Sequence, residues 1–524
     1  MRQMTRRGLA ALARTLAMLA LAACSPGPDG DALSTSAGVV EPAGVDLIIR
    51  NGRVLDGLGN PERRADVLVS DGRIFAIVDG GAGQVRAGRE IDAAGRVVAP
   101  GFIDPHSHGD PLATPEFENF LAMGVTTISL GQDGSSPDAD DLGAWLDEVQ
   151  RRGIGPNLAM FVGHGTLREQ AGIGLAPEPS PAQLDDVLRR LDVALDSTFG
   201  LSTGLEYNPG LNAGAAELEA LARVVGARDR VIMSHVRNED DDQLEASLAE
   251  LIAQGAHARV HVAHLKSVYG KGAARAREIL SVLQDARARG VRISADTYPY
   301  TASYTGVALL FPVWAKTSEQ FAEARATRYQ ELAEYLHRRV MSRNGPAATL
   351  LGTEPFVGET LADLAQRYEL PFERVLIDVI GPQGGYAAYF VMDDELQTAL
   401  LADPTIAVCS DGSPTGFHPR GHGTFARIIE DFVVGRSVLT LPEAVRKMTS
   451  LPARQIGLHD RGALLPGMAA DLVVFDPERV RARATYVDPL QLAEGFDVVL
   501  VNGQVARMAG RLDETLHGEV LRPH

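Results

Sequence analysis

Short apolar segments alternate with amphipathic segments over residues 99–459 of this 524-residue chain. Eight of them have the composition and length of buried strands: residues 101–108, 125–130, 157–163, 198–205, 230–234, 259–264, 291–296 and 405–410. Most are followed by segments with helical periodicity, such as residues 140–152, 181–195 and 273–289. Strands that alternate with helices form parallel sheets, and eight such units close a barrel. We therefore predict an α/β protein with a (β/α)8 TIM-type barrel over residues 99–459.

Two β-rich regions flank this predicted barrel. Their Val- and Ile-rich segments are residues 45–56, 65–77, 470–475 and 498–505. Three dipeptides typical of hairpin turns accompany them: Asn51-Gly52, Asp71-Gly72 and Asn502-Gly503. We predict one small β-sandwich domain built from both chain ends, residues 45–98 and 460–524, with two unrelated hairpins as the alternative.

The first residues have the features of an export signal. A basic start precedes an apolar segment, residues 16–23, far shorter than the ~20 residues of a membrane span. Leu21-Ala22-Ala23-Cys24 resembles a bacterial lipobox, in which Cys24 is lipidated and becomes the mature N-terminus. An ordinary cleaved signal and a buried starting helix are the alternatives, and Arg6-Arg7 also resembles a twin-arginine signal.

These features predict a signal peptide over residues 1–23 and, from its Ser, Pro, Gly and Asp content, a flexible tether over residues 24–44. The protein would be exported and anchored to the periplasmic or cell-envelope membrane through lipidated Cys24. Cys409 is then the only remaining cysteine, so an intramolecular disulfide is excluded. The net charge of -18 argues against nucleic acid and anionic membrane surfaces as partners.

The first predicted strand ends in Asp104-Pro105-His106-Ser107-His108. Because side chains alternate along a strand, His106 and His108 face the same way and offer two imidazole nitrogens to one metal ion. The alternative is a pair of barrel-interior histidines that neighbouring carboxylates satisfy.

Ionisable residues also follow the other predicted strands, where barrel enzymes place their chemistry. In strand order they are Asp133, His164, Glu206, His235, the pair His264 and Lys266, Tyr298, and Asp411. His235 and His264 are further metal-ligand candidates, and Asp411 is a carboxylate that binds the metal or accepts a proton from its water. His261 has the opposite parity and is assigned to the barrel exterior or a structural hydrogen bond. Five further residues have two possible interpretations, as part of a substrate-binding loop or of a solvated loop: His164, Arg168, His418, Arg420 and His422.

Four segments resemble the D-aminoacylase (N-acyl-D-amino-acid deacylase) branch of the amidohydrolase superfamily, with similarity over about residues 45–522. They are residues 162–168 (Val-Gly-His-Gly-Thr-Leu-Arg), 235–239 (His-Val-Arg-Asn-Glu), 296–303 and 466–472. The resemblance implies a metal-dependent amidohydrolase that uses metal-activated water to deacylate N-acyl-D-amino acids or related dipeptides. It assigns His106, His108, His235, His264 and Asp411 to the metal site, with Asp411 as proton shuttle. It assigns Lys266, Tyr298 and Arg420 to the substrate carboxylate, and His164 is a further substrate-binding candidate.

One position departs from the family pattern. The family has a cysteine that binds the metals after the second strand, whereas this chain reads Gly131-Gln132-Asp133-Gly134. Oxygen is a harder donor than thiolate, so we expect one or two zinc ions, with manganese or cobalt also accepted. Glu206 lies where other amidohydrolases carry a bridging carboxylate, so Asp133 and Glu206 are rival candidates for that role.

Two other functions remain open. The same machinery could hydrolyse another amide, such as a cyclic amide or an isopeptide, although Lys266 suits a substrate with a free α-carboxylate. A non-catalytic solute-binding lipoprotein is the third hypothesis, and it gives no reason for Asp411 beside four histidines. Residues 308–343, which include Trp314, form a longer connection that we predict to be a lid over the site.

Overall fold

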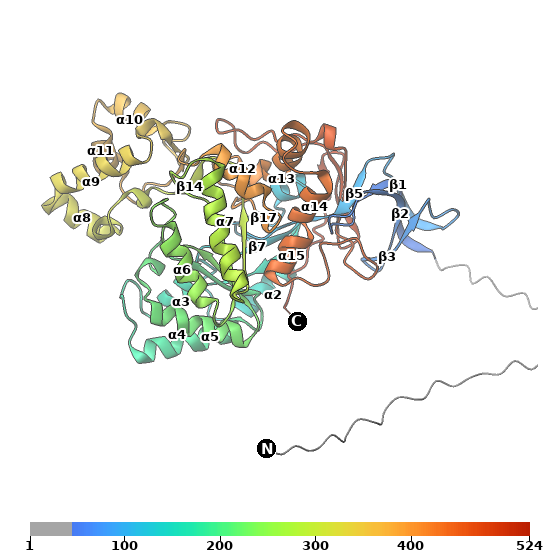
Figure 1. Ribbon diagram of the computed structural model, residues 1–524, viewed down its shortest axis with the longest axis horizontal. Coiled ribbons are helices and arrows are strands. Elements are labelled where there is room, and N and C mark those ends of the chain that lie inside the picture. Colours follow the sequence, from blue (N-terminus) through green and yellow to red (C-terminus); the bar gives the residue numbers. More distant parts are fainter. Residues whose placement is uncertain (1–43, 524) are drawn as a thin grey trace, which may run out of the picture. The chain divides into compact units, whose positions relative to one another are not determined.

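The computed structural model describes residues 44–523 (Figure 1). The predicted signal peptide, Cys24 and the tether up to residue 43 lie outside the described residues. Within the described part, the helices are all too short or too polar to span a bilayer.

Parallel strands form the centre of the fold. They are β6 (Phe102–Asp104), β7 (Val125–Leu130), β8 (Asn157–Met160), β9 (Val162–Gly163), β10 (Gly200–Gly204), β11 (Val231–His235), β12 (Arg259–Val262), β13 (Ile293–Thr297) and β17 (Ile406–Val408). They pair in chain order as β6-β7-β8 and as β9 to β13 followed by β17, and only Phe161 separates β8 from β9. Past the ends of β6 and β17, the Asp411 amide donates to His106 O (2.9 Å) and the His108 amide to Gly412 O (2.8 Å). These bonds bring the first and last strands together, as the TIM-type barrel requires.

Helices follow most of these strands. They are α2 (Leu142–Arg152), α4 (Pro181–Ala194), α5 (Ala215–Ala227), α6 (Leu244–Gln254), α7 (Gly272–Ala288), α12 (Asp394–Ala402), α14 (Leu441–Met448) and α15 (Ser450–Ile456). Helix α4 begins with a capping box, in which Ser180 accepts from the Gln183 amide and Pro181 occupies the first turn. Most of these helices bury apolar residues in the same core as the barrel strands.

Segments from both chain ends form a second, nine-stranded sheet. Its strands are β1 (Val45–Val54), β2 (Arg63–Ser70), β3 (Arg73–Asp79), β4 (Ala87–Asp92), β5 (Val97–Pro100), β18 (Leu472–Phe475), β19 (Phe496–Val501), β20 (Gln504–Met508) and β21 (Arg511–Leu512). Strands β5 and β18 pair antiparallel and join the two halves. The sheet curls back on itself, so that its two halves also meet near β3. There the Ile74 amide donates to Met468 O (2.9 Å) and the Ala470 amide donates to Gly72 O (2.9 Å). Both halves thus share one apolar core.

Two of the three expected hairpin turns are present, and the third is wrong. Asp71-Gly72 joins β2 to β3 and Asn502-Gly503 joins β19 to β20, all with positive φ as a type I′ turn requires. Asn51-Gly52 instead lies inside β1, where the register with β2 shifts between Ile49 and Gly52. Asn51 has a φ of 57° and its amide donates to Asp66 (2.8 Å). A left-handed residue there makes a β-bulge, not a chain reversal.

The connection between β13 and β17 is a substructure with its own apolar core, formed by residues between Val307 and Val391 together with Val268 from the loop after β12. It contains the sheet β14 (Ser303–Gly306), β16 (Tyr386–Tyr389) and β15 (Thr349–Leu351), and the helices α8 (Ser318–Thr327), α9 (Tyr329–Ser342), α10 (Leu361–Tyr368) and α11 (Phe372–Val375). These four helices lie together, apart from the barrel helices (Figure 1). The insertion is therefore larger than the lid predicted over residues 308–343.

Candidate metal centre and active site

Two imidazoles meet at the end of β6. The His106 side chain is fully buried and that of His108 is 34% exposed, and their ring centroids lie 5.2 Å apart. Asp104 precedes them but bonds elsewhere, since its carboxylate accepts from the Ser410 amide (3.0 Å) and hydroxyl. Burial raises the pKa of Asp104 to about 7. The structure thus brings His106 and His108 together, while the Asp104 carboxylate turns to Ser410.

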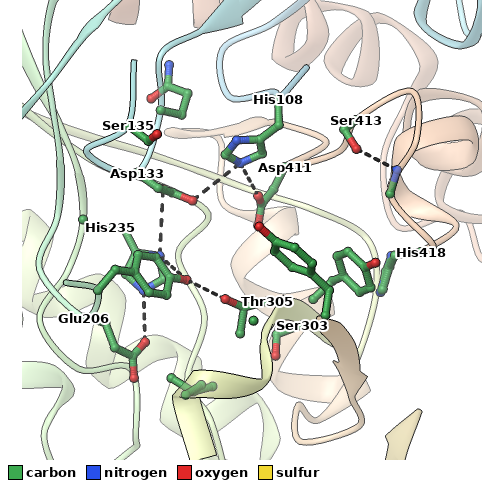
Figure 2. A pocket seen from close by; sticks show the side chains of 18 of the residues that line it. His108, Asp133, Ser135, Glu206, His235, Ser303, Thr305, Asp411, Ser413 and His418 are labelled. Carbon is green, nitrogen blue, oxygen red and sulfur yellow. Dashed lines mark hydrogen bonds and ion pairs between the residues drawn. The ribbon is translucent and has the colours of Figure 1, made fainter. Parts of the chain in front are cut away.

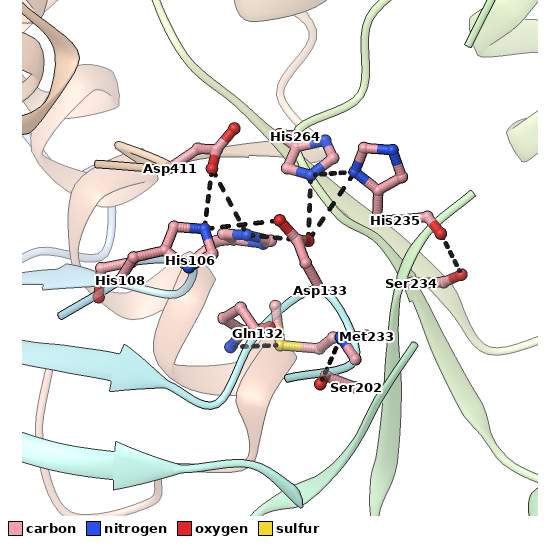
Figure 3. A network of polar contacts seen from close by, with 12 residues as sticks. His106, His108, Gln132, Asp133, Ser202, Met233, Ser234, His235, His264 and Asp411 are labelled. Atoms are coloured by element: carbon pink, nitrogen blue, oxygen red, sulfur yellow. Dashed lines mark hydrogen bonds and ion pairs between the residues drawn. The ribbon is translucent and has the colours of Figure 1, made fainter. Parts of the chain in front are cut away.

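Asp133 is at the centre of the cluster (Figure 3). Its Oδ1 lies 3.3 Å from His106 Nε2 and 3.3 Å from His264 Nε2, while its Oδ2 lies 3.5 Å from His108 Nε2. The residue has a φ of 54° in the turn after β7, between two glycines that also have positive φ. This turn brings the carboxylate back over the strand ends, so that it contacts histidines from both sides of the site.

His235 and His264 come from the other side of the barrel mouth. His235 Nδ1 lies 3.0 Å from His264 Nε2 and 3.9 Å from Asp133 Oδ1. In a tetrahedral zinc site with bonds of about 2.0–2.1 Å, two ligand nitrogens are roughly 3.3 Å apart. The nitrogen pair is therefore spaced as two ligands of one ion would be.

Asp411 completes the cluster from the loop after β17. Its Oδ1 lies 3.1 Å from His108 Nε2 and 3.8 Å from His106 Nε2. Its Oδ2 forms an ion pair with Arg420 Nη1 at 2.7 Å. Burial opposes ionisation, but Arg420 and His264 hold the pKa of Asp411 well below its usual range.

These residues fit a divalent metal. Their donor atoms form two groups with spacing suited to an ion: His106, His108, Asp133 and Asp411, and Asp133, His235 and His264. Within residues 44–523, both ring nitrogens of His106 are buried and neither makes a hydrogen bond, although Nε2 lies near the carboxylates of Asp133 and Asp411. A buried imidazole without a partner is costly in a protein interior, and a metal bond removes that cost. Asp133 belongs to both groups.

Glu206 lies outside these two groups and forms a third group of closely spaced donor atoms with His235 and Glu239. Its Oε2 contacts His235 Nε2 at 3.0 Å, on the side of the ring opposite to Asp133. A carboxylate on the outer nitrogen of a ligand histidine fixes the ring's orientation and tautomer. The geometry therefore favours Asp133 over Glu206 as the shared carboxylate.

Glu239 is a site residue that the sequence argument did not single out. Its Oε1 lies 2.6 Å from Lys266 Nζ and 3.2 Å from His264 Nδ1. Burial opposes its charge, but Lys266 and His235 keep the pKa of Glu239 well below normal. The signal in the sequence that could have identified Glu239 is its place at the end of the segment His235-Val-Arg-Asn-Glu239, four residues after a predicted metal ligand.

Two cations face one aromatic ring beside the metal residues. Lys266 Nζ lies 5.6 Å and the Arg420 guanidinium 5.1 Å from the centroid of Tyr298, and all three line the same cavity. Burial raises the pKa of Tyr298 to about 12, so its phenol stays a neutral donor. The three side chains predicted to hold a carboxylate are thus brought together.

The remaining histidines singled out in the sequence lie outside the metal-donor cluster. His164 begins helix α3 (His164–Gln170), is fully buried and lies 2.8 Å from Glu217, which also pairs with Arg168. Neither His164 nor Arg168 lines the cavity, so the structure places the substrate-binding candidate His164 in a buried ion-pair cluster instead.

His261 bonds Ser294 and Asp296, each at 2.8 Å, and is buried in the barrel. His418 lines the cavity and His422 does not.

A cavity of about 1280 Å³ opens over the cluster. Figure 2 shows His108, Asp133, Glu206, His235 and Asp411 around it, with Ser303 and Thr305 of the insertion on its wall. The insertion therefore supplies part of the wall of the active-site cavity.

The barrel, the histidine-carboxylate cluster and the cavity define a metal-dependent amidohydrolase, and comparison with known proteins agrees. A model described as Amidohydrolase family matches residues 363–507. N-acyl-D-glutamate deacylase of Alcaligenes xylosoxydans xylosoxydans is 35% identical over 490 residues, which cover 88% of this chain and 93% of that protein. The chain belongs to the D-aminoacylase (N-acyl-D-amino-acid deacylase) family of amidohydrolases.

Two solved structures agree with this assignment. N-acyl-D-glutamate deacylase from Bordetella bronchiseptica, complexed with zinc and a phosphonate inhibitor, superposes with a TM-score of 0.77 at 33% identity. A D-aminoacylase structure described for its binuclear metal center has a TM-score of 0.79 at 28% identity. Each comparison covers 91% of this chain and all of the other. The predicted family, fold class and dependence on metal are confirmed.

Proposed function

We propose that this protein removes the acyl group from N-acyl-D-amino acids. The observation that carries the proposal is the presence, in one cavity, of the metal-donor cluster and the carboxylate-binding cations Lys266 and Arg420. A free α-carboxylate beside the scissile amide is the feature that distinguishes such substrates from most other amides. Paired cations recognise it by charge-assisted hydrogen bonds.

His106, His108, Asp133, His235 and His264 would hold one or two divalent ions, most simply zinc. An ion bound there supplies Lewis acidity, which polarises the amide carbonyl and acidifies the attacking water. Asp133 would be shared by the two donor groups, and Glu206 and Glu239 would orient His235 and His264 from behind.

Asp411 is the residue placed to move protons. Its carboxylate lies beside His108 and lines the cavity, where it would accept a proton from water and return it to the leaving nitrogen. Lys266, Tyr298 and Arg420 would hold the substrate carboxylate. Binding of the carboxylate by these three side chains would determine which stereoisomer presents its amide to the metal-donor cluster.

A panel of paired N-acetyl-D- and N-acetyl-L-amino acids tests the proposal on the zinc-loaded, full-length protein. We expect hydrolysis of D-isomers, little or none of L-isomers, and loss of activity when a chelator removes the metal. Hydantoin and β-aspartyl isopeptide substrates are the comparison arm. Turnover of either of these, with none of the N-acyl-D-amino acids, would instead establish the alternative amide hydrolase.

We also propose that the enzyme is exported as a lipoprotein anchored at Cys24. Support comes from the lipobox-like Leu21-Ala22-Ala23-Cys24 after a short apolar segment. Fractionation of expressing cells tests it: the wild type should sediment with membranes and C24S should not. Wild-type protein in the soluble fraction would contradict the anchor.

A further inference from the structure

Arg343 is a buried cation on the cavity wall that the reaction described above does not use. It follows helix α9 in the insertion, its side chain is only 2% exposed, and it lines the same cavity as Lys266 and Asp411. A guanidinium withdrawn from water needs compensating partners, because its charge and its five N–H groups lose their hydration.

The protein compensates this charge only in part. Asp240 Oδ2 pairs with Arg339 at 2.7 Å, whereas Asp240 Oδ1 lies 3.4 Å from Arg343 Nη1. One carboxylate therefore serves two guanidinium groups. Nη1 of Arg343 also donates to the Tyr269 hydroxyl at 3.5 Å, whereas the buried Nε has no hydrogen-bond partner in the part of the chain that the structure describes. The cluster of Arg339, Asp240 and Arg343 thus has an excess positive charge beside the cavity.

Aromatic rings keep Arg343 in place. Its guanidinium lies 5.3 Å from the centroid of Tyr389 and 5.9 Å from that of Tyr269. Tyr389 is fully buried. Rings at this distance favour a cation and restrict its rotamers, so that the donors are positioned before a ligand arrives.

The cluster of Arg339, Asp240 and Arg343 adjoins the residues that would bind the substrate α-carboxylate. Asp240 directly follows Glu239, the partner of Lys266. This loop runs beside Val268, since the Val268 amide donates to Glu239 O at 2.8 Å and the Asp241 amide to Val268 O at 2.9 Å. A substrate held at Lys266 therefore has Asp240 and Arg343 next along the same wall.

We propose that Arg343, supported by Asp240 and Arg339, binds the side-chain carboxylate of the substrate, so that the enzyme prefers N-acyl-D-amino acids with acidic side chains. This inference rests on the proposed function and specifies its substrate class. Other parts of the cavity repel an anion, because Glu169, Glu206 and Glu354 line it. Among the described residues that line the cavity, the Lys and Arg side chains are Lys266, Arg420 and Arg343, and the first two are assigned to the α-carboxylate. Arg343 is the cation that remains for an acidic side chain.

The test compares kcat/KM for N-acetyl-D-glutamate, its neutral isostere N-acetyl-D-glutamine, N-acetyl-D-leucine and N-acetyl-D-lysine. We expect the wild type to prefer D-glutamate over D-glutamine. R343Q should lower kcat/KM for D-glutamate about 10- to 100-fold, the loss typical of a hydrogen bond to a charged group, mainly through KM. D-glutamine turnover should change by less than about threefold, and R343K should recover part of the D-glutamate activity.

R325Q is the matched control, because Arg325 is a half-exposed arginine of α8 in the same insertion and pairs with Asp378. It should leave both substrates unaffected. Equal losses on D-glutamate and D-glutamine in R343Q and R343K would show that Arg343 is only structural and would overturn the proposal. A wild type that prefers D-leucine or D-lysine would overturn it too, while leaving the deacylase function standing. Hydrolysis of none of the four would overturn both.

Discussion

At the residue scale, Asp133 is the most consequential position. A thiolate offers one donor atom, whereas the two oxygens of Asp133 face different histidines, Oδ1 toward His106 and His264 and Oδ2 toward His108. A carboxylate can therefore span two ions, although as a harder donor it holds zinc less tightly than sulfur. Burial would raise the pKa of Asp133, but the surrounding histidines keep it well below normal.

The first prediction separates Asp133 from Glu206. D133A should lose bound metal and lower turnover by at least about 100-fold, since it removes the shared donor. E206Q should cost about 10-fold or less, because it alters only an outer contact of His235. Metal content and kcat of both purified variants check this. The reverse order would mean that Glu206 is the bridging residue.

The second prediction concerns pH and metal removal. Burial lowers the pKa of His108 and His264, but Asp133 and Asp411 outweigh it and raise these values to about 9 and about 10. Metal-free protein therefore keeps these protons at neutral pH. Their stabilising contribution is complete below the unfolded value of 6.5 and is lost as pH rises toward about 10.

Zinc requires neutral imidazoles, so its binding should release protons near neutrality and strengthen as pH rises. The difference in melting temperature between zinc-loaded and chelator-treated protein should widen from about pH 6.5 to about 9.5. Differential scanning calorimetry across this range measures it. A difference that stays constant with pH would show that these histidines are already neutral in the metal-free protein.

At the scale of elements, the strands are shorter than predicted, and this changes the reason why the site residues converge. Strand β12 ends at Val262, so side-chain alternation does not reach His264. Asp133, His264 and Asp411 all have positive φ, at 54°, 36° and 50°. This backbone conformation is uncommon outside glycine and recurs at functional sites. Tight turns after the strands, not strand parity, direct these three side chains inward.

Helix α3 shows what strand-end position alone cannot decide. His164 lies directly after β9, as predicted, but the helix starts there and the ring faces Glu217 on α5. Glu217 is 53 residues away in sequence and is itself buried, with its pKa lowered by His164 and Arg168 against the effect of burial. A distant partner therefore determined the orientation of this histidine.

At the scale of the whole molecule, Asp471 connects the nine-stranded sheet to the barrel. Its carboxylate accepts hydrogen bonds from Arg461 Nη1 (2.5 Å), from the side-chain Nδ2 of Asn157 on β8 (3.1 Å) and from the backbone N–H of Asn502 in the β19–β20 turn (2.8 Å). Asp471 and Arg461 are both buried. This network gives residues 466–472, one of the segments that resemble the family, a structural role.

The third prediction follows from that burial. D471A should lower the free energy of unfolding by roughly 3–5 kcal/mol, because it leaves the charge of Arg461 buried without its partner. Urea denaturation measures the change. D513N is the control, since Asp513 is 45% exposed and pairs with His517 at the surface, where a loss below about 1 kcal/mol is expected. Similar losses in both variants would show that the Asp471 network does not stabilise the fold.

The sequence by itself determined the fold class and the end of the barrel where the chemistry lies. Alternating apolar periodicity reports local structure, and in a parallel barrel the strands end on one face, so His106, His235, His264 and Asp411 had to approach one another. It also predicted, from the family resemblance, that a carboxylate, Asp133, stands in the position of the family's cysteine.

Only the tertiary structure decided which of these side chains touch. Asp133 became the shared carboxylate and Glu206 an outer contact because of how two distant turns pack against each other. Glu239 meets Lys266 from a different strand end, and Asp240 meets Arg343 across the contact between the barrel and the insertion. Such contacts join residues far apart in sequence and depend on side-chain packing, which local periodicity does not encode.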